Sequence, residues 1–278
     1  MVGRYPPPAN RRPALFPLHG EMPRTILAGM GRIHTLITAG PTREMIDRVR
    51  DWGNIFSGQT GLDLAMAFLS LGDVTLLTSN REHAAGFDGF TGKGGMLGVE
   101  TFRSHADLQT LLRERITDAG SPTDVVAMTA AVADYAPVGS YRVVSRTPNP
   151  DGTETWITRD VSAPKVKSTH AEIAVLARQT RKLIDEFRGA WGFGGVLIKF
   201  KLEVALGDEE LLAVAGASRR ASGADLMVAN TLEMARPADP GAAAAWLMDD
   251  AAAVRVPRNE LAARIVGWTL ARLGPVGG

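Results

Sequence analysis

The segment Asn54-Ile55-Phe56-Ser57-Gly58-Gln59-Thr60-Gly61 combines small residues with a position directly before an amphipathic stretch. Ser57, Gly58 and Gly61 would let a phosphate approach the free backbone N–H groups of a first helical turn, where the helix dipole favours negative charge. The same residues also suit an ordinary helix start, with Ser57 as the N-cap and the glycines easing chain entry. The residues alone leave both interpretations open.

Further small and polar residues follow apolar runs that have the character of buried strands. These segments are Thr38–Glu44, Ala130–Tyr135, Phe200–Glu203 and Asn230. In an open parallel sheet, ligands bind beyond the carboxyl ends of the strands. We therefore expect the functional residues to gather at that edge.

Several other chemistries are not supported by the residue spacing. The turn at Gly40 reads Gly-Pro-Thr-Arg instead of the dinucleotide-binding G-x-G-x-x-G, and Gly92-Lys93 lacks the leading glycine of a P-loop. The five histidines have no metal-ligand spacing, so no protein metal site is expected. The sequence contains neither a G-x-S-x-G elbow nor a cysteine.

The elements that must position these residues alternate regularly along the chain. Five short aliphatic or β-branched runs predict strands buried on both faces. They are Ile33–Thr38, Val74–Thr78, Val125–Thr129, Val196–Phe200 and Leu226–Ala229. Apolar stripes at helical spacing predict helices at residues 62–69, 173–187 and 260–273. This alternation predicts an α/β, Rossmann-like doubly wound fold, with a mainly parallel sheet and helices on both faces.

Three segments depart from the alternation. Residues 141–147 and 153–160 flank a turn-rich centre and predict a β-hairpin arm at about 141–166. Residues 245–249 and 252–256 predict a second hairpin, and the glycine-rich residues 86–98 predict a mobile loop.

Composition limits the partners and the compartment. The 278 residues carry a formal net charge of +1, so no overall field would recruit nucleic acid or an anionic membrane. No apolar run approaches the roughly 20 residues that cross a bilayer. The lack of cysteine fits a reducing compartment, and we expect a cytoplasmic protein.

Residues 1–30 differ from the rest of the chain in their frequent prolines and arginines. They have neither the continuous apolar stretch of a secretory signal nor the serine content of a transit peptide. We expect a flexible N-terminal arm over 1–30 and a single domain over 31–278.

Five blocks in a fixed order resemble a known family. They are Leu36–Glu44 with Ile46-Asp47 and Val49-Arg50, Asn54–Gly61, Asp124–Val126 with Ala130–Tyr135, Phe200–Glu203, and Ala224–Asn230. The series resembles the phosphopantothenate–cysteine ligase (phosphopantothenoylcysteine synthetase) family, in a stand-alone form without the decarboxylase domain. The resemblance therefore makes 31–278 a single ligase domain.

The resemblance implies a ligase of coenzyme A biosynthesis that joins 4′-phosphopantothenate to L-cysteine. The carboxylate would attack the α-phosphorus of a nucleoside triphosphate, releasing pyrophosphate, and the cysteine amine would then displace the nucleotide from the acyl-nucleotide. Mg²⁺ would be carried by the nucleotide phosphates. The resemblance also implies a homodimer, and the short N-terminal arm predicts neither FMN nor decarboxylation.

Individual residues follow from the same resemblance. Asn54 matches the asparagine that turns the acyl-nucleotide into product. Lys165 in Pro164–Ser168 resembles a catalytic lysine, with Lys167 as the competing choice. The nucleotide and phosphate contacts are assigned to Gly40, Ser57, Gly58, Gly61, Ala130, Asp134 and Phe200, although Phe200 would also suit a core.

The departures from the family pattern concern the nucleotide base. Arg181–Ile184 stands where many members have P-D-I-[LV], and Ser218–Ser222 stands where they have two lysines on a helix. The Ala130–Tyr135 block looks like cytidine-using members, whereas Phe200–Glu203 looks like ATP-using ones. CTP is favoured and ATP is the alternative.

An NAD(P)-dependent reductase and a non-catalytic nucleotide-binding protein of the same fold remain rival interpretations. The lack of a Tyr-x-x-x-Lys pair disfavours the reductase.

Overall fold

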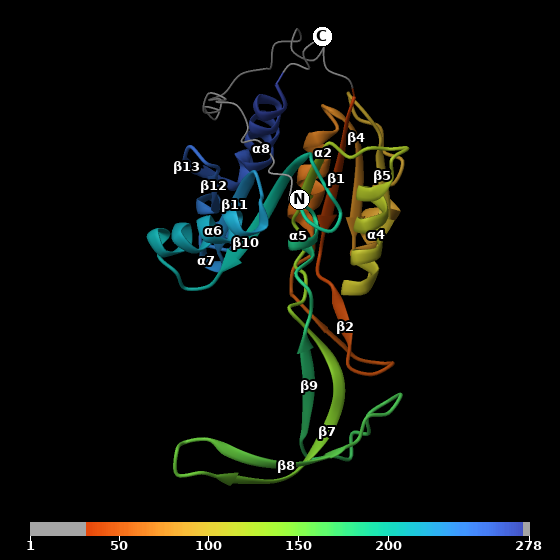
Figure 1. The fold of residues 1–278 in the computed structure, drawn as a ribbon, viewed down its shortest axis with the longest axis vertical. Coiled ribbons are helices and arrows are strands. Elements are labelled where there is room, and N and C mark those ends of the chain that lie inside the picture. Colours follow the sequence, from red (N-terminus) through yellow and green to blue (C-terminus); the bar gives the residue numbers. More distant parts are fainter. Residues whose placement is uncertain (1–31, 275–278) are drawn as a thin grey trace, which may run out of the picture. The chain divides into compact units, whose positions relative to one another are not determined.

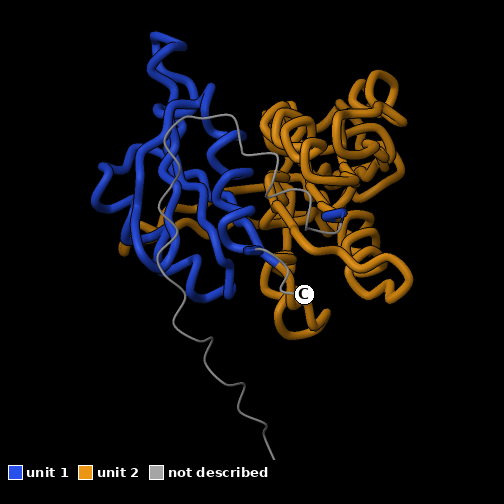
Figure 2. The backbone as a smooth tube through the Cα atoms, turned by 90° about the horizontal axis from the view of Figure 1, so that it is seen from above, with its two compact units in different colours: residues 1–33, 196–278 blue, residues 34–195 orange. Residues whose placement is uncertain are grey.

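The structure is a computed structural model that describes residues 32–274 (Figure 1). The predicted arm over residues 1–30 lies outside the described residues. The chain forms two compact units (Figure 2). Unit 2 contains residues 34–195, and unit 1 contains the described residues 32–33 and 196–274. The single ligase domain over 31–278 stays a prediction.

The sheet of unit 2 is built from the apolar runs near its N-terminus. Its strands are β1 (Ile33–Ala39), β4 (Gly72–Thr78), β5 (Leu97–Thr101) and β6 (Val125–Met128). They lie in the order β6–β1–β4–β5, with β1 parallel to β6 and β4 parallel to β5. Leu36, Leu76 and Val125 are almost completely buried, as expected for strands covered on both faces.

Helices flank this sheet. They are α2 (Gln59–Phe68), α3 (Arg81–Phe87), α4 (His105–Thr117) and the short α5 (Leu183–Glu186). Helix α2 contacts β4 and α3 contacts β5. Ser104 caps α4, because its side chain accepts a hydrogen bond from the backbone N–H of Asp107 while the Asp107 carboxylate reaches back to the N–H of Ser104.

Two small antiparallel sheets complete unit 2. The first pairs β2 (Arg43–Met45) with β3 (Asp51–Gly53). The second, which we call the arm, has the strand order β8–β7–β9. Its strands are β7 (Tyr135–Pro148), β8 (Glu154–Asp160) and β9 (Ile173–Gln179). The predicted hairpin is confirmed by the pairing of β7 with β8.

One sequence prediction in unit 2 is wrong. The helix predicted over residues 173–187 is a strand, β9, followed by the single turn α5. Strand β9 pairs antiparallel with β7 from Tyr135 to Arg142, so pairing with a distant segment overrides the helical spacing. The glycine-rich residues 86–98 contain the end of α3 and the start of β5.

The loop between α3 and β5 holds glycines that pack closely, and its predicted mobility stays a prediction. A Cβ added to Gly95 would lie 2.0 Å from the backbone oxygen of Gly72, and one added to Gly94 would lie 2.7 Å from that of Leu69. Glycine is therefore needed here for close packing of the backbone against the start of β4.

Unit 1 contains the C-terminal strands and helices. Its strands are β10 (Val196–Glu203), β11 (Leu226–Thr231), β12 (Ala244–Met248) and β13 (Ala253–Pro257). Its helices are α6 (Asp208–Ser222), α7 (Leu232–Ala235), the 3-10 turn η1 (Pro240–Ala242) and α8 (Arg258–Leu273). Strands β10 and β11 are parallel, and β12 and β13 form the predicted second hairpin.

Helices cover both faces of these strands. Leu211 and Ala215 of α6 pack against Met227 and Ala229 of β11. The alternate residues Leu226 and Val228 are also buried, and α8 contacts β10, β12 and β13. The predicted α/β class, with a mainly parallel sheet, helices on both faces and a hairpin arm, is confirmed.

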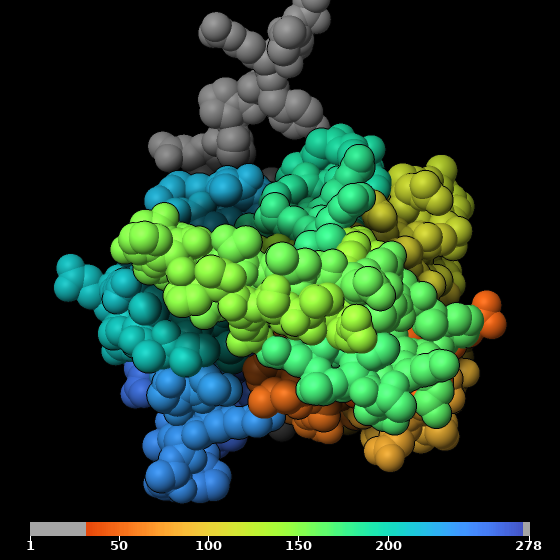
Figure 3. All heavy atoms as spheres, turned by 90° about the horizontal axis from the view of Figure 1, so that it is seen from below, coloured from red at the N-terminus to blue at the C-terminus, as the bar shows by residue number. Residues whose placement is uncertain are grey.

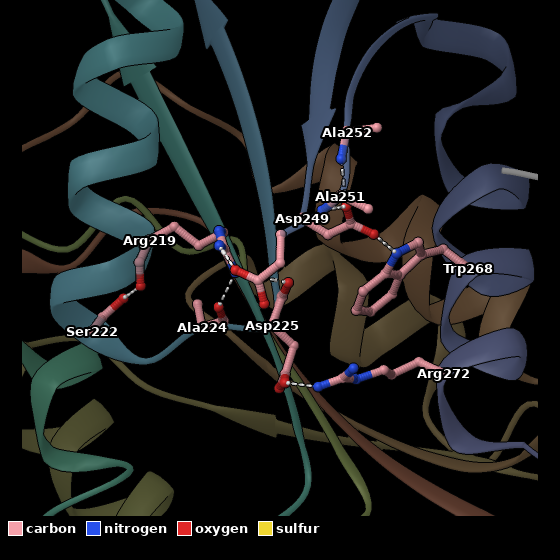
Figure 4. Close-up of polar contacts among 10 residues, drawn as sticks. Arg219, Ser222, Ala224, Asp225, Asp249, Ala251, Ala252, Trp268 and Arg272 are labelled. Atoms are coloured by element: carbon pink, nitrogen blue, oxygen red, sulfur yellow. Dashed lines mark hydrogen bonds and ion pairs between the residues drawn. The ribbon is translucent and has the colours of Figure 1, made fainter. Parts of the chain in front are cut away.

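A polar network ties α6 and α8 to the strands of unit 1 (Figure 4). The side chain of Arg219 is only 7% exposed, pairs with Asp250 and donates to the backbone oxygen of Ala224 at 3.1 Å. Trp268 donates to Asp249 at 2.8 Å, and Arg272 donates to Asp225 at 3.1 Å. These contacts fix the ends of both helices against the β12–β13 turn and the start of β11.

Among the helices of residues 32–274, none combines the length and apolar character needed to span a bilayer.

Candidate functional site

The loop before α2 packs directly on the turn after β1. Gly40 and Gly58 have φ angles of +81° and +85°, which favour glycine. A Cβ on Gly58 would lie 2.6 Å from the backbone nitrogen of Gly40, and a Cβ on Gly40 would lie 2.4 Å from the Ser79 Oγ. A Cβ on Gly61 would lie 2.6 Å from both the Ala39 Cβ and the Thr129 Oγ1. Gly58 and Gly61 therefore bring α2 close to the carboxyl end of β1, and Gly40 lets the turn after β1 approach Ser79.

The N-terminus of α2 is capped by backbone alone. The N-cap residue is Gly58, without a side-chain cap, so the alternative prediction of Ser57 as N-cap is wrong. The Ser57 hydroxyl only accepts a long 3.4 Å hydrogen bond from the backbone N–H of Gln59. The first turn of α2 contains no acidic side chain that would oppose an anion. This arrangement leaves the positive end of the helix dipole available to a phosphate.

The segment around Ala130 is joined to the turn after β1 by a ladder of hydrogen bonds. The backbone N–H of Ala130 donates to the Thr38 Oγ1 at 3.0 Å, and that of Ala131 donates to the oxygen of Gly40 at 3.0 Å. Ala133 donates to the Thr42 Oγ1 at 2.8 Å. These bonds explain why Thr38 and Thr42 are fully buried although they are polar.

Two asparagines link the segment Asn54–Gly61 to its surroundings. We call this segment the phosphate loop after its predicted role. The exposed Asn54 donates from Nδ2 to the backbone oxygen of Ala131 at 3.1 Å, so it lies beside the Ala130–Asp134 segment. Asn80, the N-cap of α3, donates from Nδ2 to the backbone oxygen of Ser57 at 3.2 Å. Asp134 is exposed, and its backbone oxygen accepts from the N–H of Thr180 at 2.9 Å. Gly40, Asn54, Ser57, Ala130 and their neighbours thus share one edge of unit 2.

The segment Pro164–Ser168, which contains Lys165 and Lys167 and is called the lysine segment below, is held by a buried carboxylate. The Asp47 side chain has no exposed surface and accepts the backbone N–H of Val166 at 3.1 Å. Arg50 donates to the backbone oxygen of Val166 at 2.8 Å and pairs with Asp47. Val166 is 3% exposed, whereas Lys165 and Lys167 on either side of it are exposed.

Hydrogen bonding shifts the ionisation of Asp47 strongly. The Arg50 guanidinium holds the pKa of Asp47 far below its usual range, and the backbone N–H groups of Val49, Val166 and Arg50 add to this effect. Asp47 is therefore a permanent anion at the base of the lysine segment.

Further positions from the sequence predictions lie on or next to β10, α6 and α5. Phe200 lies in unit 1 on β10, where it is half-buried and pairs with Val228 of β11. Arg219, which lies within the stretch Ser218–Ser222 where the family pattern has two lysines, is engaged in the network of Figure 4. Lys182 is the exposed N-cap of α5. Within the described residues, no group of three His, Asp or Glu side chains could hold a metal ion.

Part of the chain matches a known domain family. Residues 30–143 match the model described as "DNA/pantothenate metabolism flavoprotein C-terminal domain". These residues belong to that family. The family region contains Gly40, Asn54, the phosphate loop, Ala130 and Asp134, whereas Lys165 and Phe200 lie beyond it.

Relatives of the family region extend the comparison along the chain. The coenzyme A biosynthesis bifunctional protein CoaBC of Thermococcus kodakarensis is 30% identical over 199 residues, which cover 71% of this chain and 41% of that protein. The chain spans less than half of the length of the curated relatives that it matches.

Solved structures share the fold. The DNA/pantothenate metabolism flavoprotein from Streptococcus pneumoniae has a TM-score of 0.65 at 24% identity, covering 84% of this chain and 96% of that one. A Cab2 variant in complex with phosphopantothenate-cysteine has a TM-score of 0.55 at 16% identity, covering 87% of this chain and 89% of that one.

Three residues that support the site have no predicted role. Asp47 and Arg50 belong only to a block that resembles the family, and Asn80 belongs to no predicted site. The pattern Asp47-x-Val49-Arg50 carries a local signal, because an aspartate often accepts from backbone N–H groups two and three residues later, as Asp47 does at 2.8 Å for both. Its contact with Val166 has no local signal.

Proposed function

We propose that this chain is a phosphopantothenate–cysteine ligase, which joins 4′-phosphopantothenate to L-cysteine in coenzyme A biosynthesis through an acyl-nucleotide. The observation that carries the proposal is the first turn of α2, which has Gly58 as its cap and no acidic side chain, with Asn54 bonded to Ala131 beside it. The family match over residues 30–143 supports the proposal, as does the similarity to the CoaBC protein of Thermococcus kodakarensis and to the Cab2 variant in complex with phosphopantothenate-cysteine.

The proposed roles follow from charge and position. Ser57, Gly58 and Gly61 hold phosphate at the N-terminus of α2, where the dipole and backbone N–H groups stabilise negative charge. Lys165 supplies positive charge to the phosphoryl oxygens during attack by the substrate carboxylate. Asn54 orients the acyl-nucleotide for attack by the cysteine amine. In-line positioning of the two substrates supplies much of the remaining acceleration.

We propose CTP as the preferred nucleotide, with Mg²⁺ bound through its phosphates. A cytosine pocket must be too short for a purine and must satisfy the amino group and carbonyl of the base. Each buried hydrogen bond that is lost leaves a polar group unpaired, which costs about 1–3 kcal/mol. Lys182 and the backbone near Leu183 are the proposed contacts. We expect kcat/KM for CTP to exceed that for ATP by at least about tenfold.

We also propose that two copies pair through the arm. Exposed apolar side chains are concentrated on its three strands, whose surface is shown in shades of green (Figure 3). They are Tyr135, Val138, Val144, Trp156, Ile157, Ile173 and Leu176. Contiguous exposed apolar surface is typical of a protein interface. Sedimentation at several concentrations should give a dimer that Trp156→Glu with Ile157→Lys converts to monomer.

The decisive experiment supplies purified protein with 4′-phosphopantothenate, L-cysteine and each of four nucleoside triphosphates. Pyrophosphate release and the mass of the amide product are measured together. Release that requires phosphopantothenate, with a product of the expected mass, supports the ligase. Nucleotide binding without release would identify the non-catalytic alternative, and neither binding nor release would contradict the proposal.

A further inference from the structure

A polar pocket of about 520 Å³ lies within unit 2 at the carboxyl ends of β4 and β5. Its volume falls within the range of small-molecule sites. Its charged lining consists of Arg43, Arg81, Arg103, Asp51 and Asp107. The roles proposed for the phosphate loop and the lysine segment use none of these five residues.

Asp51 holds two of the arginines at the pocket. Arg43 Nη1 donates to Asp51 Oδ1 at 3.2 Å, and Arg103 Nη2 donates to Asp51 Oδ2 at 3.0 Å. The side chains of Arg43 and Arg103 nevertheless remain 53% and 57% exposed. A guanidinium has five N–H donors, so each arginine keeps donors for a ligand while its direction is fixed by Asp51.

The third arginine adds uncompensated charge. Arg81 begins α3 and is exposed, and none of the ion pairs among the described residues involves it. Asp107 is already engaged, because its Oδ2 accepts the backbone N–H groups of Ser104 at 2.9 Å and Arg103 at 3.2 Å. The pocket is therefore lined by three guanidinium groups and two carboxylates. Asp51 bridges Arg43 and Arg103, and Asp107 caps α4.

The pocket also neighbours the phosphate loop. Ser79 lines the pocket, and a Cβ on Gly40 would meet its Oγ at 2.4 Å. The next residue, Asn80, donates to the backbone oxygen of Ser57. The two sites thus adjoin each other at Gly40 and Ser79, and the three arginines of the pocket lie outside the phosphate loop.

We propose that Arg43, Arg81 and Arg103 form a second anion site, distinct from the phosphate loop, that binds a compact ligand carrying phosphate groups. Guanidinium groups match phosphate oxygens in geometry and charge, and three of them from β2, α3 and the β5–α4 turn converge on one pocket. The inference does not depend on the ligase activity, because binding is measured directly.

The test titrates inorganic pyrophosphate into the full chain by calorimetry at constant ionic strength. We expect Arg81→Gln and Arg103→Gln each to weaken one binding event by at least about tenfold, the effect of losing charge-assisted hydrogen bonds. Arg113→Gln on α4 removes the same charge from an exposed position outside the pocket and should change affinity less than twofold.

Gly58→Ala separates the two sites, since its Cβ would clash with the backbone of Gly40 and would meet none of the three arginines. Binding that survives in Gly58→Ala and is lost in Arg81→Gln supports the second site. Loss in Gly58→Ala with full binding in both arginine variants would place pyrophosphate on the phosphate loop alone and overturn the proposal. Equal weakening by Arg81→Gln and Arg113→Gln would reveal a response to net charge only, and would overturn it too.

Discussion

The carboxylate of Asp47 accepts a hydrogen bond from the backbone N–H of Val166, which lies 119 positions later in the chain, at 3.1 Å. The link is reinforced by Arg50, which bonds both residues. The backbone N–H of Arg48 also donates to the oxygen of Pro164 at 3.0 Å. Because Val166 is buried and anchored, the two exposed lysines beside it project from a fixed backbone. Precise placement of a catalytic charge needs such support.

The first prediction concerns this anchor. Asp47→Asn replaces one acceptor oxygen by an amide group that faces the donors of Val166 and Arg50, so unpaired donors remain in a buried site. We expect the melting temperature to fall by several degrees and kcat to fall about tenfold with little change in KM for the nucleotide. Glu114→Gln, which removes an exposed carboxylate from α4, is the control. An unchanged melting temperature would contradict the anchoring role.

The second prediction separates the two lysines. Lys165→Gln should reduce pyrophosphate release about a hundredfold or more, because it removes positive charge from the developing phosphoryl oxygens. Lys167→Gln, on the other side of Val166, should stay within a few-fold of the unchanged protein. The reverse result would shift the catalytic role by two positions. Near-normal release in both variants would place the catalytic charge elsewhere.

The third prediction divides the reaction at Asn54. Asn54→Ala should still release pyrophosphate but accumulate acyl-nucleotide, because its proposed role begins after activation. Quenched-flow sampling with mass detection would measure the intermediate. Asn149→Ala, in the exposed turn between β7 and β8, changes the same residue type away from the site and should leave both steps unchanged. Equal loss of both steps in Asn54→Ala would show that Asn54 acts earlier.

The fourth prediction tests the packing of α2. In Gly61→Ala the new Cβ would meet the Ala39 Cβ and Thr129 Oγ1 at 2.6 Å and the backbone oxygen of Thr38 at 2.9 Å. Overpacking of this kind lowers the free energy of unfolding by about 1–3 kcal/mol. Gly86→Ala in α3 has open space around it, so the helical gain of about 0.5–1 kcal/mol over glycine should appear instead. Urea unfolding of both variants measures the two changes in the free energy of unfolding, which should have opposite signs.

The fifth prediction concerns pH and His83. Burial lowers the pKa of His83, and the nearby charges of Glu82 and Asp63 only partly oppose this effect. Its ring lies between the Thr78 Oγ1 at 3.1 Å and the Asn80 Nδ2 at 3.2 Å, so protonation of Nε2 would face the donating amide of Asn80.

The unfolded chain therefore binds this proton more readily than the folded chain. Stability should be fully present above about pH 6.5 and should decrease as pH falls below that value. We expect the melting temperature to decrease more steeply between about pH 6.5 and pH 5 in the unchanged protein than in His83→Gln. Parallel curves for the two proteins would contradict this assignment.

The sequence by itself determined the strands whose signal is local. Runs such as Val125–Met128 and Leu226–Ala229 consist of apolar residues that suit strands buried on both faces, so their identity needs no distant partner. The hairpin of β7 and β8 was similarly marked by the turn residues between its strands. The edge that holds the candidate site was predicted from the rule that loops after parallel strands share one side of the sheet.

Only the tertiary structure decided the features that depend on partners far away in the chain. Residues 173–179 have helical spacing but form a strand because β7 offers them backbone hydrogen bonds. Gly61 reads as a phosphate contact in the sequence, yet its lack of a side chain is also required by the approach of α2 to β1. The pairing of Asp47 with Val166 could not be read from either segment, because a buried carboxylate selects its donors by position in space and not by position in the sequence.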